Sequence, residues 1–153
     1  MGSGTEALHI AIRALGIGVG DEIITTSHTA VATATAITLA GATPVFVDIE
    51  PDYFTIDPNL VEKAIGPNTK AIIPVHIYGQ PCNMDQIMTI ANENNIYVVE
   101  DCAQAHGAKY SGQSVGSIGH IGCWSFCQDK IMSTGGEGGM VTTNDENFWQ
   151  KMW

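Results

Sequence analysis

Apolar and polar positions follow two different periods along the chain, which predicts helices alternating with strands. Residues 6–15 carry apolar side chains three and four positions apart, as an amphipathic helix does, and Ser3 with Glu6 fits a capping box before it. Short apolar runs bounded by glycine, proline or acidic residues predict strands. The expected helices are 6–15, 31–40, 58–65, 84–93 and 146–153, and the expected strands are 22–26, 44–49, 71–76, 96–100, 121–126 and 140–143.

This alternation predicts an α/β fold, with a mainly parallel sheet sandwiched by helices. Ligands of such sheets bind at the carboxyl ends of the strands and at helix N-termini. The chain shows no internal repeat, linker or low-complexity segment, so we expect one domain. It reaches a helix cap within its first three residues and ends inside an expected helix, and we therefore expect it to be a piece of a longer protein.

Composition excludes several classes of partner. Hydrophobic residues make up 44% and charged residues 14%, and the net charge of −10 argues against nucleic acid or an anionic membrane. No apolar run is long enough to span a bilayer, and no basic, apolar N-terminal signal is present. The four cysteines lack metal-site spacing, so we expect reduced, buried thiols, no metal and a cytoplasmic location.

Lys130 is the first candidate for chemistry. The chain has only five lysines and one arginine, and the other four lysines lie in polar surroundings. Lys130 instead follows the apolar run 121–126 and precedes a glycine-rich stretch, 135–139. A lysine in a crowded, partly apolar place can act as an amine nucleophile that forms Schiff bases. A surface lysine beside a flexible loop explains the same pattern equally well.

Gly4 and Thr5 are the second candidates, because they open the first expected helix. Free N–H groups, the positive end of the helix dipole and a hydroxyl suit a phosphate. A plain N-cap is the alternative. Ser125 lies five residues before Lys130 and can add a second hydroxyl to a bound anion.

Asp101 is the third candidate, since it ends an apolar strand and is followed closely by Gln104 and His106. Its carboxylate can pair with a pyridinium nitrogen, or it can simply be satisfied by N–H groups of the loop. A phosphate site, an acid for a ring nitrogen and an amine for an aldehyde are together what pyridoxal 5'-phosphate (PLP) requires. A Rossmann-type dinucleotide site is disfavoured, because no G-x-G-x-x-G joins a strand to a helix.

Six motifs give the chain a family resemblance over essentially all 153 residues. They are S-G-T-E-A-L at 3–8, G-D-E-I-I at 20–24, A-T-P-V-F-V-D-I-E at 42–50, K-A-I-I-P-V-H-I-Y-G-Q-P at 70–81, E-D-C-A-Q-A-H-G-A at 100–108 and S-F-C-Q-D-K-I-M-S-T-G-G-E-G-G at 125–139. With these motifs the chain resembles the DegT/DnrJ/EryC1/StrS family of sugar aminotransferases, which are fold-type-I PLP enzymes. The last two motifs are quite specific.

The resemblance implies a role for each matching residue. Lys130 is expected to form a Schiff base with the cofactor, and Asp101 to pair with the pyridine nitrogen. Gln104 is expected near the ring or its phenolic oxygen. The phosphate is expected to be held by Gly4, Thr5 and Ser125.

The residue that stacks on the ring is less clear from the resemblance. The family often has an aromatic residue where this chain has Ala30, which cannot stack, so His28 is the candidate substitute. His106 and Glu137 match the motifs and are expected to act as structural supports.

The implied function is PLP-dependent transfer of an amino group from an amino acid, by family habit glutamate, to a nucleotide-linked keto sugar, in amino-sugar and polysaccharide biosynthesis. Lysine at 130 favours transamination over the dehydration of histidine-bearing relatives. The family forms homodimers, and residues 1–153 are expected to be part of its large domain, without the N-terminal segment and the C-terminal small domain. A non-catalytic cofactor-binding or scaffold relative, or an inactive fragment, is the alternative.

Overall fold

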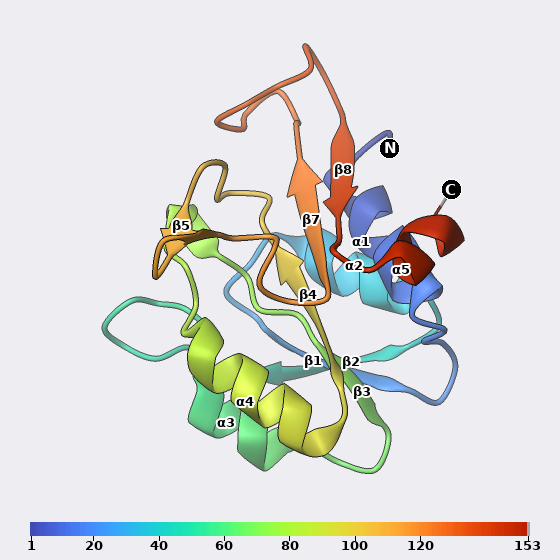
Figure 1. Ribbon diagram of the computed structural model, residues 1–153, viewed down its shortest axis with the longest axis vertical. Helices are drawn as coiled ribbons and strands as arrows, with labels where there is room; N and C mark the ends of the chain where they lie inside the picture. The colour runs from blue at the N-terminus through green and yellow to red at the C-terminus, as the bar shows by residue number, and fades with distance from the viewer. Residues whose placement is uncertain (153) are drawn as a thin grey trace.

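A six-stranded sheet lies between two layers of helices in the computed structural model, which describes residues 1–152 (Figure 1). The strand order is β2-β1-β3-β4-β7-β8; the first five strands are parallel, and β8 is antiparallel to β7. This confirms the predicted α/β class. The strands are β1 Glu22–Thr26, β2 Thr43–Val47, β3 Thr69–Ile72, β4 Tyr97–Asp101, β7 Ile121–Ser125 and β8 Gly139–Thr142.

The helices are α1 Gly4–Ala14, α2 Val31–Leu39, α3 Pro58–Ala64, α4 Met84–Asn94 and α5 Glu146–Lys151, with a short 3-10 turn, η1, at Ile77–Gly79. Helices α1 and α2 pack together on one face of the sheet, and α3 and α4 cover the other (Figure 1). The last helix was expected to reach Trp153, which lies outside the described residues. No helix within residues 1–152 is long and apolar enough to cross a bilayer.

The start of α1 forms half of the predicted capping box. Ser3 Oγ accepts a hydrogen bond from the Glu6 N–H at 3.1 Å, as the box requires. The Glu6 carboxylate, however, accepts from the N–H of Gly2 rather than from that of Ser3. Two hydrogen bonds of Glu6, one to Ser3 and one to Gly2, therefore hold the start of the helix.

The sheet separates two hydrophobic cores. One lies under α1 and α2 and includes Val99, and the other lies under α3 and α4 and includes Val98. Because successive side chains of a strand point to opposite faces, β4 sends Glu100 and Asp101 to opposite sides of the sheet. That alternation determines which of the two carboxylates reaches the site described below.

Two local features differ from the sequence prediction. The strand expected at 71–76 ends its regular pairing at Ile72, because Pro74 has no N–H to donate; an isolated bridge between Val75 and Asp101 follows. The glycine- and serine-rich loop contains a small hairpin, β5 Lys109–Tyr110 and β6 Gln113–Ser114. Its two turn residues, Ser111 and Gly112, both have positive φ, as a type I′ turn demands.

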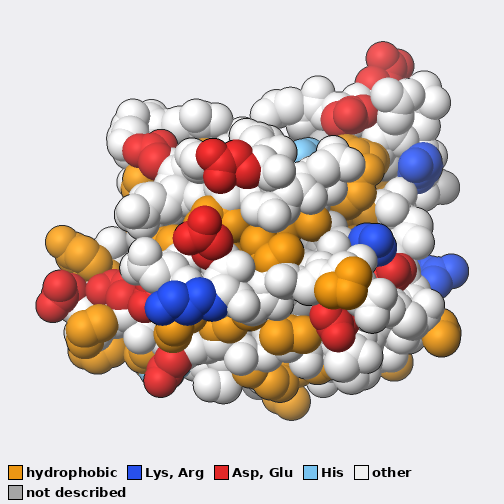
Figure 2. Space-filling model, turned by 90° about the horizontal axis from the view of Figure 1, so that it is seen from below, with side chains coloured by type: hydrophobic (Ala, Val, Ile, Leu, Met, Phe, Trp, Pro, Cys, Tyr) orange, Lys and Arg blue, Asp and Glu red, His pale blue; other side chains and the backbone are white. Residues whose placement is uncertain are grey.

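Negative charge is dispersed over the face of the molecule that Figure 2 shows. Figure 2 shows acidic side chains at several separate places on the face seen from below, with basic and hydrophobic side chains between them. This view shows no single-sign patch of the kind that steers a polyanion.

Candidate cofactor site

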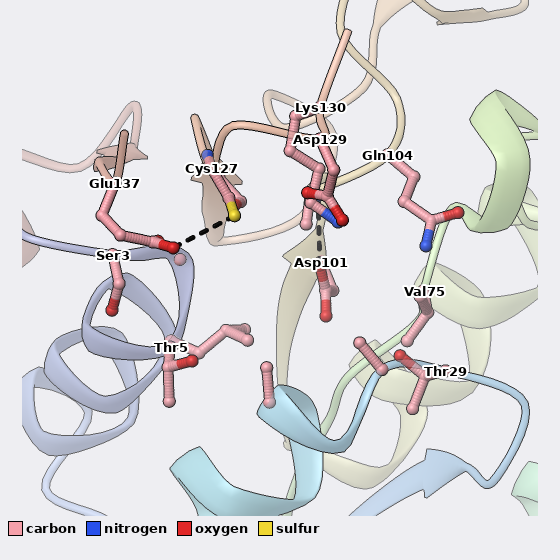
Figure 3. A pocket seen from close by; sticks show the side chains of 16 residues that line it. Ser3, Thr5, Thr29, Val75, Asp101, Gln104, Cys127, Asp129, Lys130 and Glu137 are labelled. Atoms are coloured by element: carbon pink, nitrogen blue, oxygen red, sulfur yellow. Dashed lines mark hydrogen bonds between the residues drawn. The ribbon is translucent and has the colours of Figure 1, made fainter. Parts of the chain in front are cut away.

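A cavity of about 270 Å³ opens where β4 and β7 end and α1 begins (Figure 3). Sixteen residues line it, from six separate stretches of the chain. Among them are six of the seven residues predicted to bind or act on a cofactor: Gly4, Thr5, Asp101, Gln104, Ser125 and Lys130. The structure therefore brings residues that are up to 126 positions apart in sequence around one space.

The first wall of the cavity is the N-terminal end of α1 packed against the end of β7. A Cβ added at Gly4 would lie 2.6 Å from the Cβ of Ser125, so only glycine permits this close approach. Ser125 is 6% exposed, and its hydroxyl and that of Thr5 lie on this wall. First-turn N–H groups have no partner inside their helix, so the wall offers hydrogen-bond donors and a positive dipole end to an anion.

Asp101 forms the floor of the cavity and is 4% exposed. Its Oδ1 accepts a hydrogen bond from the Ala103 N–H at 3.1 Å, and its Oδ2 accepts one from Thr33 Oγ1 at 2.8 Å. Burial raises the pKa of Asp101, while these two bonds and the charges of His76 and Lys130 act in the opposite direction. Each carboxylate oxygen has two lone pairs, and each of these hydrogen bonds uses only one of them. Asp101 can therefore accept hydrogen bonds from the protein and still face a ligand.

Lys130 enters the cavity from the long loop between β7 and β8, residues 126–138, which extends beyond the body of the sheet (Figures 1 and 3). The backbone N–H of Lys130 donates to the carbonyl of Cys127 at 3.0 Å, and that of Thr134 donates to Phe126 at 3.2 Å. These bonds fold the loop back on itself. The lysine side chain is partly exposed, and it shares the cavity with Asp101.

Two further carboxylates on the same loop line the cavity, and the sequence did not indicate a ligand role for either. Asp129 precedes Lys130, and Figure 3 shows both side chains on the same side of the cavity. Glu137 accepts a hydrogen bond from the Cys127 thiol at 3.1 Å, and this bond is the main reason why the pKa of Cys127 is raised. The contact links both ends of the loop across the cavity mouth.

Gln104 lines the cavity on the side away from α1 (Figure 3). Its Oε1 accepts a hydrogen bond from the Tyr78 N–H at 2.9 Å, and Tyr78 has a positive φ of 56°. The bond ties the loop after β4 to the turn η1. Gln104 is thus held in place from outside the cavity that it lines.

His28 is the one predicted site residue that does not line the cavity. Its ring lies edge-on to Tyr78, with ring centroids 5.7 Å apart. Ala30 lines the cavity instead, at the position where the resemblance leads one to expect an aromatic side chain. The stacking role of His28 stays a prediction, and it requires a change in ring position relative to this structure.

His106 packs beside β7, away from the cavity. Its ring contacts Trp124 and Phe126, at centroid distances of 5.5 and 5.4 Å, and both ring nitrogens are buried without a hydrogen-bond partner in residues 1–152. Burial lowers the pKa of His106. These contacts suit the predicted role of a structural support.

The most important residue that the sequence did not indicate is Thr33. It lies on α2, whose small side chains predict tight packing and nothing more. The only available signal was the spacing of Thr29 and Thr33, which places two hydroxyls on one side of a helix start. Whether these hydroxyls point toward Asp101 depends on how α2 packs on the sheet.

A buried cluster of His76, Glu100 and Cys102 lies on the opposite side of β4. Glu100 accepts hydrogen bonds from His76 Nε2 at 3.0 Å and from the N–H groups of Gly116, Ile118 and Gly119 at 2.6–2.9 Å. His76 Nδ1 accepts from the Cys82 N–H at 3.1 Å. Both ring nitrogens are engaged and burial raises the pKa of the Cys102 thiol, so these groups form a hydrogen-bonded cluster rather than a ligand set.

Fold and site together are those of an α/β protein that binds a cofactor. The N-terminal end of a helix, a buried carboxylate and a lysine surround one cavity at the carboxyl ends of parallel strands, where α/β proteins bind cofactors.

Comparison with known proteins gives the family. The model of the DegT/DnrJ/EryC1/StrS aminotransferase family matches residues 1–153, and the chain belongs to this family. It is 51% identical over 150 residues, 98% of the chain, to a UDP-N-acetyl-3-dehydro-alpha-D-glucosamine 3-aminotransferase of Acidithiobacillus ferrooxidans, of which it covers 41%.

Solved structures agree with this assignment. An aminotransferase from Psychrobacter cryohalolentis is 58% identical and matches the whole chain with a TM-score of 0.98, over 39% of its own length. NtdA from Bacillus subtilis, solved with bound cofactor PMP, is 38% identical with a TM-score of 0.91; 99% of this chain covers 34% of it. The chain spans about 40% of the length of the first curated relatives that it matches.

Proposed function

We propose that the protein containing this chain is a PLP-dependent aminotransferase that moves an amino group from an amino acid, glutamate, to a nucleotide-linked keto sugar in amino-sugar biosynthesis. The observation that carries the proposal is that Lys130 and Asp101 line one cavity together with the N-terminal end of α1. The name of the Acidithiobacillus relative supports the substrate class, and the PMP bound to NtdA supports the cofactor.

We propose further that these residues form part of the large domain of a homodimer, which acts in the cytoplasm with a small C-terminal domain. The short span of this chain along its relatives supports the division into domains. Three of the four cysteine thiols are buried and all four are free, as in a protein kept under reducing conditions.

The residues of the cavity fit the parts of this cofactor. The α1 N-terminus, Thr5 and Ser125 form a donor set suited to its phosphate, and Asp101 offers a carboxylate for its ring nitrogen. When bound, PLP supplies an aldehyde that condenses with amines and a ring that accepts electrons from the adjacent carbon.

Three residues then perform the steps that the protein must supply. Asp101 holds a proton at the ring nitrogen. Lys130 would hold the cofactor through its side-chain amine, and as a free base it would accept the proton of the donor's α-carbon and give it up again within the cavity. Gln104, which lines the cavity, would hold the edge of the ring.

Replacing Lys130 tests this proposal. The full-length protein with PLP should show the visible absorbance of a lysine-bound cofactor, and borohydride reduction should fix the added mass on the peptide containing Lys130. Lys130→Ala should lose both signals and slow the glutamate half-reaction by about 10²–10⁴-fold. Lys109→Ala, which removes an exposed lysine outside the cavity, is the matched control.

The outcomes separate the competing functions. Retention of the lysine-bound absorbance in Lys130→Ala would show that Lys130 was assigned the wrong role. Normal cofactor attachment without any spectral change on adding glutamate would instead indicate a non-catalytic, cofactor-binding relative.

A further inference from the structure

A chain of three side chains leads from the N-terminal end of α2 to the floor of the cavity. The Thr29 and Thr33 hydroxyl oxygens are 2.9 Å apart, and Thr33 Oγ1 donates to Asp101 Oδ2 at 2.8 Å. Thr33 is fully buried, whereas Thr29 is partly exposed and lines the cavity. The chain thus runs between a cavity wall and the carboxylate beneath the cavity.

The number of protons on each hydroxyl fixes the direction of these hydrogen bonds. A threonine hydroxyl has one proton to donate. Thr33 uses its proton toward Asp101, so the short contact with Thr29 must be a hydrogen bond that Thr29 donates and Thr33 accepts. Both protons therefore point toward the carboxylate.

The bond from Thr33 also departs from the usual behaviour of a helical threonine. Such a hydroxyl commonly bonds to a carbonyl three or four residues earlier in its own helix. Thr38, five residues further along α2, does this with the carbonyls of Ala34 and Thr35. Thr33 instead directs its proton across to β4, 68 positions away in sequence.

We propose that Thr33 is a positioning residue for the reaction, with Thr29 behind it: its hydroxyl holds one oxygen of Asp101 and so fixes the plane of the carboxylate toward the ring nitrogen of PLP. This rests on the proposed function. The Ala103 N–H holds the other oxygen, so the carboxylate is gripped at both ends and cannot rotate without breaking a bond. Burial strengthens the constraint, because a hydrogen bond to a carboxylate is stronger in the low dielectric around the fully buried Thr33.

The first test is made without cofactor. In the full-length protein with ¹³C-labelled aspartate carboxyls, the Asp101 signal is assigned by its loss in Asp101→Asn, and its pKa is read from an NMR titration. Thr33→Val should raise this pKa, because the donor that favours the ionised form is gone. Thr33→Ser should leave it near the wild-type value, since the hydroxyl is retained.

The second test measures the cofactor. Thr33→Val should weaken PLP binding about tenfold and alter the pH dependence of the lysine-bound absorbance, while Thr33→Ser stays within about twofold of wild type. Thr38→Val, an exposed hydroxyl on the same helix, is the matched control. Thr33→Ala replaces Thr33→Val if the larger side chain prevents folding, because alanine favours helix.

The proposal is overturned if the variants without a hydroxyl match Thr33→Ser in both the Asp101 titration and the binding of PLP. A wild-type protein that forms no lysine-bound cofactor would refute the proposed function, and the titration would still decide what Thr33 does to Asp101.

Discussion

Adjacent carboxylates in β4 are both buried, but their pKa values are shifted in opposite directions. Burial acts to raise the pKa of both Glu100 and Asp101. For Glu100, the hydrogen bonds from His76 and from the N–H groups of Gly116 and Gly119 outweigh burial, and its pKa is lowered. For Asp101 burial prevails and the pKa is raised. The ionised form of Glu100 is thus stabilised by the fold itself, whereas the hydrogen bonds to Asp101 do not offset the effect of its burial.

Glu100→Gln should destabilise the protein by about 3 kcal/mol at neutral pH, because the amide removes the charge and turns an NH₂ group toward buried N–H donors. The lowered pKa stabilises the folded state above the ordinary glutamate pKa, and this contribution is lost as the pH falls through the lowered value. The difference between variant and wild type should therefore shrink in acid. Urea unfolding at several pH values measures it.

Glu93→Gln is the matched control for this change, since Glu93 is exposed on α4. Its free energy of unfolding should stay within about 0.5 kcal/mol of wild type. Equal stability of Glu100→Gln and Glu93→Gln at neutral pH would show that the charge of Glu100 contributes nothing to the free energy of unfolding.

At the scale of the elements, α1 packs against the first residue of β8, Gly139, which has no side chain. Gly139 exchanges backbone hydrogen bonds with Met1, at 3.0 Å in each direction. A Cβ on Gly139 would overlap the carbonyl group of Ser3, which is backbone and cannot move aside cheaply. This contact holds the cap of α1, and with it the wall of the cavity that α1 forms, against the sheet.

Gly139→Ala should therefore destabilise the protein by about 1–3 kcal/mol, through overpacking between two backbone segments. Gly136→Ala is the matched control within the same glycine-rich stretch, because a Cβ there has no atom within 4 Å. Thermal unfolding compares the two variants. A Gly139→Ala protein as stable as Gly136→Ala would mean that α1 can shift away from β8 without cost.

Sequence patterns predicted the elements unequally, for a physical reason. The helices at 31–40 and 58–65 end within a residue of their positions in the structure, because a glycine follows each of them. The helix at 84–93 also ends within a residue of its position in the structure. The hairpin at 109–114 has strands of two residues, too short to show a period. The antiparallel direction of β8 is set by the path of the preceding loop, which no local pattern records.

At the scale of the whole molecule, local sequence patterns predicted only some of the residues of the candidate site. Lys130, Asp101 and Ser125 were predicted from motifs, since their residue types sit at special points of a local pattern. Thr33 was not, because its contact with Asp101 depends on packing between α2 and β4. Contacts made by non-local placement leave no trace in the spacing of neighbouring residues.

Thiol reactivity should report burial across the molecule. Cys82, Cys102 and Cys123 are buried, and burial raises the pKa of Cys82 to about 12. Only Cys127 of these four should react with iodoacetamide in the native protein, slowly, because its hydrogen bond to Glu137 raises its pKa. Peptide mass mapping should find all four modified in denaturant.

Bound PLP should also protect Cys127, because this thiol lines the cavity. Cys127→Ser gives the background of the native reaction. Modification of Cys123 at the rate of Cys127 would contradict the packing of α1 on β7.

The split of Glu100 and Asp101 between two sides of β4 carries a consequence for how this family can diverge. A slip of the strand by one position would turn Glu100 toward the face of the cavity and Asp101 toward the face of the amides at 116–119. Because the pleat repeats every second residue, every other side chain of β4 would change faces as well, so no single substitution can compensate for the slip. Divergence by insertion or deletion of a single residue within β4 is therefore incompatible with this arrangement of the two carboxylates.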